Sequence, residues 1–255
     1  VATVNAWDGA SQADRFKSYM NRVASDQQPD LIFLQEAPIT IDAVFGNRDR
    51  YDLVSLRHPH PDKEFERMMT VRRRDSNWTV ESTDVVETST CNTPRVATIQ
   101  VFTNASGTQV TVANVHLCGG RFDEKYHCNN TVGLKEAKLE VLSTILSKKP
   151  DIVLGDFNSD YLAYQSKSAD KLKFLEEQGC TAETAQQWHD ASYELLLSKG
   201  FSRVPFDEPT SIYGTLPDGI WFFNARVQMK ASNVLDALTK KASDHNGLMA
   251  KLQIA

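Results

Sequence analysis

Four short polar clusters stand where apolar runs of the sequence end or begin. They are Gln35-Glu36, His116, Asp156-Phe157-Asn158 and Ser243-Asp244-His245. Short apolar runs bounded by polar residues are typical of buried strands. Strand ends hold side chains rigidly beside loops that leave room for a ligand. The clusters supply the carboxylate, amide and imidazole groups that metal-assisted hydrolysis requires, so we predict one hydrolytic site assembled from four distant segments.

Glu36 follows the apolar run 31–34. A carboxylate in that position is costly to bury unless a cation accompanies it. Mg²⁺ takes one or two carboxylates together with water and substrate phosphate. We therefore predict Glu36 as the main metal ligand. Taken alone, a glutamate at the start of a loop is more often an ordinary surface residue, so this prediction depends on the other clusters.

Asp156 and Asn158 flank a phenylalanine just after the run 151–154. Gly155 allows the chain to turn away from the strand, so both polar side chains can reach one ligand. We predict that Asp156 orients or deprotonates water and that Asn158 hydrogen-bonds a phosphoryl oxygen. The ordinary alternative is an Asx turn.

His245 is an imidazole that can exchange a proton near neutral pH when a carboxylate fixes its tautomer. Neighbouring residues of a strand point in opposite directions, so Asp244 is not expected to be that carboxylate. Asp218, at the entrance of an earlier strand, is the better candidate. Asp244 is then available to the metal. A capping turn is the ordinary alternative for the Ser-Asp-His segment.

His116 and Asn114 share one face of a predicted strand. We expect His116 to donate a hydrogen bond to a phosphoryl oxygen or to protonate a leaving group. The alternative is a core histidine whose ring nitrogens are already satisfied. Asn5, near the end of the first strand, either contacts phosphate or caps a turn.

Composition limits the possible partners. The 255 residues are 41% hydrophobic and contain no linker-like tract, which favours a single domain over 1–255. A net charge of −5 argues against a broad basic face for nucleic acid, but a bound cation would still allow a phosphate substrate. The basic run 72–74 is expected to be a solvated strand edge, with phosphate steering as the alternative. No apolar stretch approaches the roughly 20 residues of a membrane span. We also expect the protein to be a monomer.

The four cysteines form no C-x-x-C pair, which argues against structural zinc. Cys118 and Cys128 flank a loop after His116 and could bridge it in an oxidising compartment, and the sequence leaves the disulfide state of all four cysteines, including Cys91 and Cys180, open. Strand-like sequence begins almost at the first residue, so no signal peptide is expected. The sequence leaves two locations open: secretion, with the signal peptide already removed, or the inside of the cell.

Hydrophobic periodicity and turn signals predict many strands and a few helices. The expected strands are 2–6, 30–35, 51–56, 67–74, 78–83, 96–103, 109–117, 151–154, 220–223, 227–231 and 248–254. The expected helices are 11–24, 134–146, 169–178 and 182–199. The three strands between 51 and 83 have hairpin spacing, and 96–103 and 109–117 flank a clear hairpin turn. This pattern is typical of two packed sheets with helices outside them.

Taken together, the clusters resemble the endonuclease/exonuclease/phosphatase superfamily, which has the deoxyribonuclease I-like fold. The matching segments occur in the family's order over nearly the whole chain: Asn5, Leu34-Gln35-Glu36, Asn114-Val115-His116, Gly155-Asp156-Phe157-Asn158, Pro217-Asp218 and Ser243-Asp244-His245. The resemblance implies an α/β four-layer sandwich, in which two packed mixed β-sheets are flanked by helices. It also implies a Mg²⁺ or Mn²⁺ cofactor and in-line attack of an activated water on a phosphate ester.

The resemblance also implies roles for single residues. Glu36 resembles the family's metal ligand, aided by Asn5 and Asp244. His245 with Asp218 resembles the pair that activates water or stabilises the transition state.

Asp156 and Asn158 look like the family's orienting pair, and His116 resembles the second histidine of its nuclease-like branches. Asn114 and Arg121 are expected to bind the substrate phosphate. Arg121 follows His116 by five residues, which is similar to the His-Leu-x-x-x-Arg pattern of tyrosyl-DNA phosphodiesterases.

We therefore predict a Mg²⁺-dependent phosphoric ester hydrolase, a phosphodiesterase or nuclease whose substrate is nucleic acid. DNA and a phosphotyrosyl-DNA linkage are the substrates considered first. One alternative keeps the chemistry but changes the substrate to a phospholipid headgroup or an inositol phosphate. A second alternative is a non-catalytic binding protein, because a fold alone does not fix function.

Overall fold

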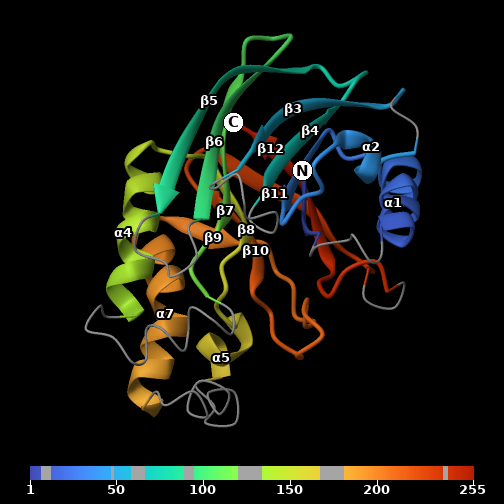
Figure 1. The fold of residues 1–255 in the computed structure, drawn as a ribbon. Helices are drawn as coiled ribbons and strands as arrows, with labels where there is room; N and C mark the ends of the chain where they lie inside the picture. Colours follow the sequence, from blue (N-terminus) through green and yellow to red (C-terminus); the bar gives the residue numbers. More distant parts are fainter. Residues whose placement is uncertain are drawn as a thin grey trace.

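The computed structural model describes residues 1–6, 13–46, 49–58, 67–88, 95–119, 134–166, 181–237 and 241–255. The described residues form two six-stranded sheets that lie face to face (Figure 1). The strands are β1 (Ala2–Asn5), β2 (Leu31–Gln35), β3 (Tyr51–Arg57), β4 (Met68–Arg73), β5 (Trp78–Thr88), β6 (Arg95–Asn104), β7 (Gln109–His116), β8 (Ile152–Asp156), β9 (Phe201–Arg203), β10 (Asp218–Phe223), β11 (Val227–Leu235) and β12 (Gly247–Ile254).

Each sheet mixes parallel and antiparallel pairs. The first sheet has the order β11-β12-β1-β2-β4-β3, and the second has the order β5-β6-β7-β8-β10-β9. The parallel pairs are β1 with β2 and β7 with β8, at the centre of each sheet. Parallel neighbours end at the same edge of a sheet, so both sheets can present the last residues of their central strands at one end of the sandwich.

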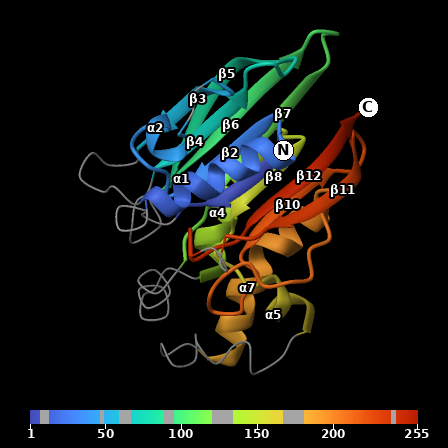
Figure 2. The same ribbon diagram turned by 90° about the vertical axis from the view of Figure 1, so that its right-hand side faces the viewer.

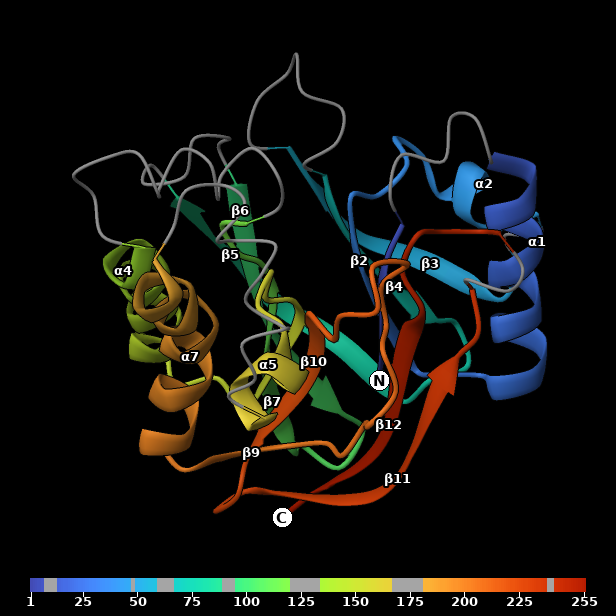
Figure 3. The same cartoon turned by 90° about the horizontal axis from the view of Figure 1, so that it is seen from below.

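Helices cover the outer face of each sheet, which produces four layers (Figures 2 and 3). The first sheet is covered by α1 (Ala13–Arg22), the π-helical turn η2 (Val23–Gln27) and α2 (Ile41–Val44). The second sheet is covered by α4 (Leu134–Ser147) and α7 (Ala182–Ser198), while the short helix α5 (Tyr161–Ser166) follows β8. This arrangement confirms the predicted four-layer sandwich of two mixed sheets.

Apolar side chains fill all three interfaces between the layers. Phe16 and Met20 of α1 are fully buried against the first sheet, and Leu142 and Ile145 of α4 are fully buried against the second. Between the sheets, Phe33 and Phe102 meet edge to face with ring centroids 6.2 Å apart. The apolar residues of α4 thus face the sheet, as their spacing in the sequence predicts.

Several expected elements differ in extent or in partner. The helix expected over 11–24 is α1 followed by the π-helical turn, which ends at Gln28 with a left-handed backbone (φ 46°). β3 and β4 do form a hairpin, but β5 crosses to the second sheet and pairs with β6 instead of β4. The helix expected over 169–178 lies outside the described residues. α2, α5 and the three-residue strand β9 were not expected because each is too short to show a periodic pattern.

The basic run at the end of β4 is not a solvated strand edge. β4 lies inside the first sheet, and Arg73 forms ion pairs with Asp30 at 2.7 Å and with Asp75 at 2.6 Å. Arg74 pairs with Asp52 at 2.9 Å. Since these carboxylates already balance the guanidinium groups, the run is poorly suited to steering phosphate.

None of the helices in the described part of the chain combines the length and the apolar character that a membrane span requires.

Candidate active site

In the second sheet, strand register aligns three of the predicted residues across neighbouring strands. His116, the last residue of β7, pairs with Asp156, the last residue of β8. Asp156 pairs in turn with Asp218, the first residue of the antiparallel β10. Gly155 makes this close approach possible, because a Cβ atom there would lie 2.1 Å from the carbonyl oxygen of Val115 and its φ is +130°. Only glycine tolerates both conditions.

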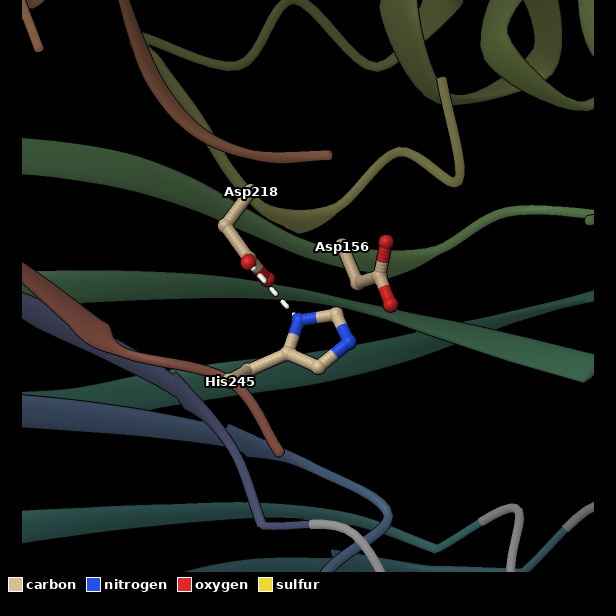
Figure 4. Close-up of side chains that lie close together, drawn as sticks. All are labelled: Asp156, Asp218 and His245. Atoms are coloured by element: carbon tan, nitrogen blue, oxygen red, sulfur yellow. Dashed lines mark hydrogen bonds and ion pairs between the residues drawn. The ribbon is translucent and has the colours of Figure 1, made fainter. Parts of the chain in front are cut away.

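His245 joins this row from the segment before β12 (Figure 4). Its Nδ1 lies 2.8 Å from Oδ2 of Asp218. Asp156, Asp218 and His245 each offer a ligand atom within 4.8 Å of the others. The backbone N–H of His245 donates to the hydroxyl of Ser243, which itself donates to the carbonyl of Asn5. The imidazole is therefore fixed relative to both sheets.

Electrostatics assign different protonation states to these buried groups. Burial lowers the pKa of His245, but Asp218, Asp156 and Asp244 more than reverse this and raise it to about 10. Burial pushes the pKa of Asp156 upward, yet His245 and His116 bring it below its usual value. At neutral pH the arrangement thus holds an imidazolium beside an ionised Asp156. Burial raises the pKa of Asp218, even though the hydrogen bond to His245 opposes that shift.

Asn5 and Glu36 reach the row from the first sheet. Nδ2 of Asn5 donates to Oε1 of Glu36 at 3.2 Å and to Oδ2 of Asp156 at 3.0 Å, so one amide links the two carboxylates. Glu36 has a left-handed backbone with φ of 50°, which is uncommon for a residue other than glycine, asparagine or aspartate. Such a conformation costs about 1–3 kcal/mol and is concentrated at functional sites.

His116 lies between these groups and contacts an arginine that the sequence analysis did not identify. Its Nε2 is 3.6 Å from Oε1 of Glu36 and 3.7 Å from Oδ2 of Asp156. Nη1 of Arg95 approaches both ring nitrogens, at 3.0 and 2.7 Å. Burial first and Arg95 second keep the pKa of His116 well below its usual value. A guanidinium can only donate, so the ring is neutral and suits hydrogen-bond donation rather than protonation of a leaving group.

The loop after β8 is held by local hydrogen bonds. The backbone N–H of Asn158 donates to Oδ1 of Asp156 at 2.7 Å, and its Nδ2 donates to the carbonyl of Leu117 at 3.1 Å. Asn158 has a φ of 47°, which asparagine tolerates better than most residues. The Asx turn proposed as an alternative to function is therefore present, and it fixes the side chain of Asp156.

Asp244 has an unusual environment. Its Oδ1 is buried and has no hydrogen-bond partner among the described residues. Burial, together with the charges of Asp156 and Asp218, raises its pKa. A buried carboxylate oxygen without a donor is the arrangement that a bound cation would satisfy. Asp244 and Glu36 also supply the oxygen ligands that Mg²⁺ and Mn²⁺ prefer, so the residues present fit such an ion.

Asn114 does not reach this site. Its side chain is fully buried, its Oδ1 accepts a hydrogen bond from Nε2 of Gln35 at 2.6 Å, and its Nδ2 donates to the carbonyl of Leu34 at 3.3 Å. The prediction that Asn114 binds substrate phosphate is therefore corrected: the residue shares a strand face with His116, as expected, but lies two residues deeper and links the sheets.

We expect Asn114→Ala to destabilise the fold by about 1–3 kcal/mol, because Gln35 loses a buried acceptor. The KM for a phosphate-ester substrate should change by less than twofold. Chemical denaturation and steady-state kinetics measure the two effects. A large rise in KM at unchanged stability would contradict this structural role.

The remaining predictions concern the four cysteines and Arg121. Cys118 is disulfide-bonded, whereas Cys91, Cys128, Cys180 and Arg121 lie outside the described residues.

No protein-family model matches the sequence, and no curated protein matches it. The fold nevertheless matches solved structures over the whole chain. An endonuclease/exonuclease/phosphatase protein from Bacteroides vulgatus is 14% identical, with a TM-score of 0.67 and coverage of 100% of this chain and 98% of that chain.

Two further structures have a TM-score of 0.64. A Bacteroides thetaiotaomicron mannosyl-6-phosphatase is 14% identical, with 99% of this chain and 98% of that chain covered. TDP2 from D. rerio, complexed with a single-strand DNA product, is 17% identical, with 99% and 97% covered. At such low identities these similarities establish the fold alone.

Proposed function

We propose that this chain, which has the fold of endonuclease/exonuclease/phosphatase proteins, is a hydrolase that cleaves a phosphate ester with the help of a divalent metal ion. The observation that carries the proposal is the unbroken set of contacts at one end of the sandwich. Asn5 connects Glu36 to Asp156, and Asp156 lies with Asp218 and His245 within 4.8 Å. These contacts join residues separated by as many as 240 positions, and they support our proposal that the residues act on one phosphate group.

We assign the metal to Glu36 and Asp244, with Asn5 beside them. We give the cluster of Asp156, Asp218 and His245 a different role, because Nδ1 of its imidazole is already hydrogen-bonded to Oδ2 of Asp218. When bound, Mg²⁺ or Mn²⁺ would stabilise the negative charge that develops on the phosphoryl oxygens.

The protein's own groups then have separate roles. Asp156, which is ionised, orients the attacking water and accepts its proton. The imidazolium of His245, held by Asp218, donates to a phosphoryl oxygen and stabilises the charge of the transition state. Neutral His116 and the amide of Asn158 are the further hydrogen-bond donors to that group. The P–O bond to the attacking water forms as the P–O bond to the leaving oxygen breaks in line with it, and the leaving oxygen takes up a proton from solvent, so no covalent intermediate is required.

The substrate we propose is a phosphodiester in nucleic acid, with DNA or a phosphotyrosyl-DNA linkage first. The structural similarity to a DNA-bound TDP2 favours this class, as does the sequence pattern that includes Arg121. The second candidate is a phosphomonoester of a small molecule, which the similarity to a mannosyl-6-phosphatase favours. The lipid-headgroup and inositol-phosphate alternatives have no comparable observation.

A substrate panel tests the proposal. It contains plasmid DNA, a phosphotyrosyl oligonucleotide, RNA, sphingomyelin, inositol phosphates and a hexose 6-phosphate, each with Mg²⁺ and with EDTA. We expect cleavage of a nucleic-acid substrate that EDTA abolishes. Cleavage of the hexose phosphate alone would favour the second candidate. Metal binding without turnover of any compound would favour the non-catalytic alternative.

A further inference from the structure

Lys138 is a lysine buried on the apolar face of a helix. It lies on α4 at the spacing that places Val141, Leu142 and Ile145 against the second sheet, and its side chain is fully buried. Burying an ammonium group is costly unless its donors are satisfied. A lysine on such a face therefore needs a specific structural reason.

The contacts of Lys138 supply that reason. Its Nζ donates to the carbonyl of Phe157 at 2.7 Å, to the carbonyl of Asn158 at 2.7 Å and to the hydroxyl of Ser159 at 2.5 Å. An ammonium group has three N–H donors. The three oxygens belong to consecutive residues of the loop that leaves β8, so one side chain holds three successive positions.

This loop carries two groups of the candidate active site. Asp156 immediately precedes the three residues that Lys138 holds, and Asn158 is one of them. With its carbonyl bound by Lys138, Asn158 keeps its backbone N–H on Oδ1 of Asp156. The Asp156 carboxylate also accepts a hydrogen bond from Asn5. Its orientation therefore depends in part on the ammonium group of Lys138, which reaches the loop from α4.

We propose that Lys138 is a positioning residue that fixes the loop of Asp156 and Asn158 in its reactive geometry. The inference rests on the proposed function, because the loop matters for turnover only if Asp156 handles the water. Loss of Lys138 removes one shared ammonium donor from two carbonyls and a hydroxyl, so the loop relaxes and the carboxylate moves. Displacements of about 1 Å in an active site can reduce rates by about 10²-fold.

The test uses the full chain and two matched controls, one on α4 and one just after it. Lys138→Met keeps the length and the apolar stem of the side chain but removes the donors. Leu142→Ala removes a fully buried side chain from the same face and so destabilises the helix while leaving the three donors of Lys138 in place. Lys148→Met removes a lysine that is half exposed and whose one ion pair among the described residues is a surface pair with Asp84.

At a temperature where every variant is folded, we expect Lys138→Met to lower kcat by at least about tenfold and to change KM by less than twofold. Leu142→Ala should lose stability but keep kcat within twofold, and Lys148→Met should change neither. Lys138→Gln, which retains two donors, should have an intermediate kcat. It replaces the methionine variant if that variant does not fold.

Hydrogen exchange separates this inference from the proposed function. In Lys138→Met the amide of Asn158 should exchange at least about tenfold faster, whereas in Leu142→Ala it should change no more than the rest of the second sheet. Faster exchange in a protein that turns over no substrate would retain the positioning role and reject the enzyme. Unchanged exchange, or a loss of kcat that Leu142→Ala matches, would overturn the inference.

Discussion

Replacing His245 by alanine is expected to lower turnover of the panel's best substrate by at least about 10²-fold, the usual scale for an acid–base group. The imidazolium is the one cationic donor that the described residues place between Asp156 and Asp218, and its pKa of about 10 keeps it charged at neutral pH. Without it, the developing charge on the phosphoryl oxygens loses a charge-assisted hydrogen bond. Steady-state kinetics at saturating metal measure the effect.

Two variants complete that experiment. Asp218→Asn removes the charge that raises the pKa of His245 but keeps the shape of the side chain, so it should reduce turnover less than His245→Ala does. His58→Ala removes an exposed imidazole and should leave turnover unchanged. If His245→Ala turned over substrate as fast as His58→Ala, the imidazole would have no part in the reaction.

Replacing Glu36 by glutamine should weaken Mn²⁺ or Mg²⁺ binding by at least about 10²-fold. Residues that merely support a metal ligand typically contribute 10- to 100-fold to affinity, so loss of the ligand charge should cost at least the upper value. The amide keeps the size of the side chain and the left-handed backbone, so stability should be little changed. Calorimetric titration with Mn²⁺ gives the affinity, and the metal dependence of turnover gives an independent value.

Asp84→Asn is the matched control for Glu36→Gln. It neutralises a carboxylate that is 61% exposed and that, within the described part of the chain, pairs with Lys148 alone, at 3.4 Å on the surface. Exposed pairs of this kind contribute little, so neither metal affinity nor turnover should change. Equal metal affinity in the two variants would show that the ion is held elsewhere.

The sequence was most informative where strand ends carry polar groups. Glu36, Asp156 and His245 were predicted because four polar clusters at the ends of apolar runs together indicated one site, although each cluster alone has an ordinary structural explanation. No single segment of the sequence shows that these residues lie close together. Their proximity depends on parallel pairing within each sheet and on the packing of one sheet against the other. The partner of His245 was found by geometry, because strand alternation excluded Asp244 and left Asp218.

Other features needed the structure, and each has a physical reason. Asn114 lies on the strand face that the alternation of side chains predicts. That alternation does not distinguish a residue at the end of the strand from one two positions further inside the sheet. Arg95 stands at the start of β6, three residues before Thr98, which pairs with Asn114, so strand pairing alone does not place it against His116. Lys138 left a signal in the sequence, a lysine on an apolar helical face, but its partners belong to a loop twenty residues away. The crossing of β5 to the second sheet overrides a spacing that locally favours a hairpin.

The proposed hydrolysis depends most on one cation that binds where the two sheets meet. The most direct measurement is a crystal structure with Mn²⁺, with anomalous scattering to locate the ion. We predict a single strong peak in contact with carboxylate oxygens of Glu36 and Asp244. A structure that lacks any ion at these residues, at Mn²⁺ concentrations that support full turnover, would contradict the proposed site.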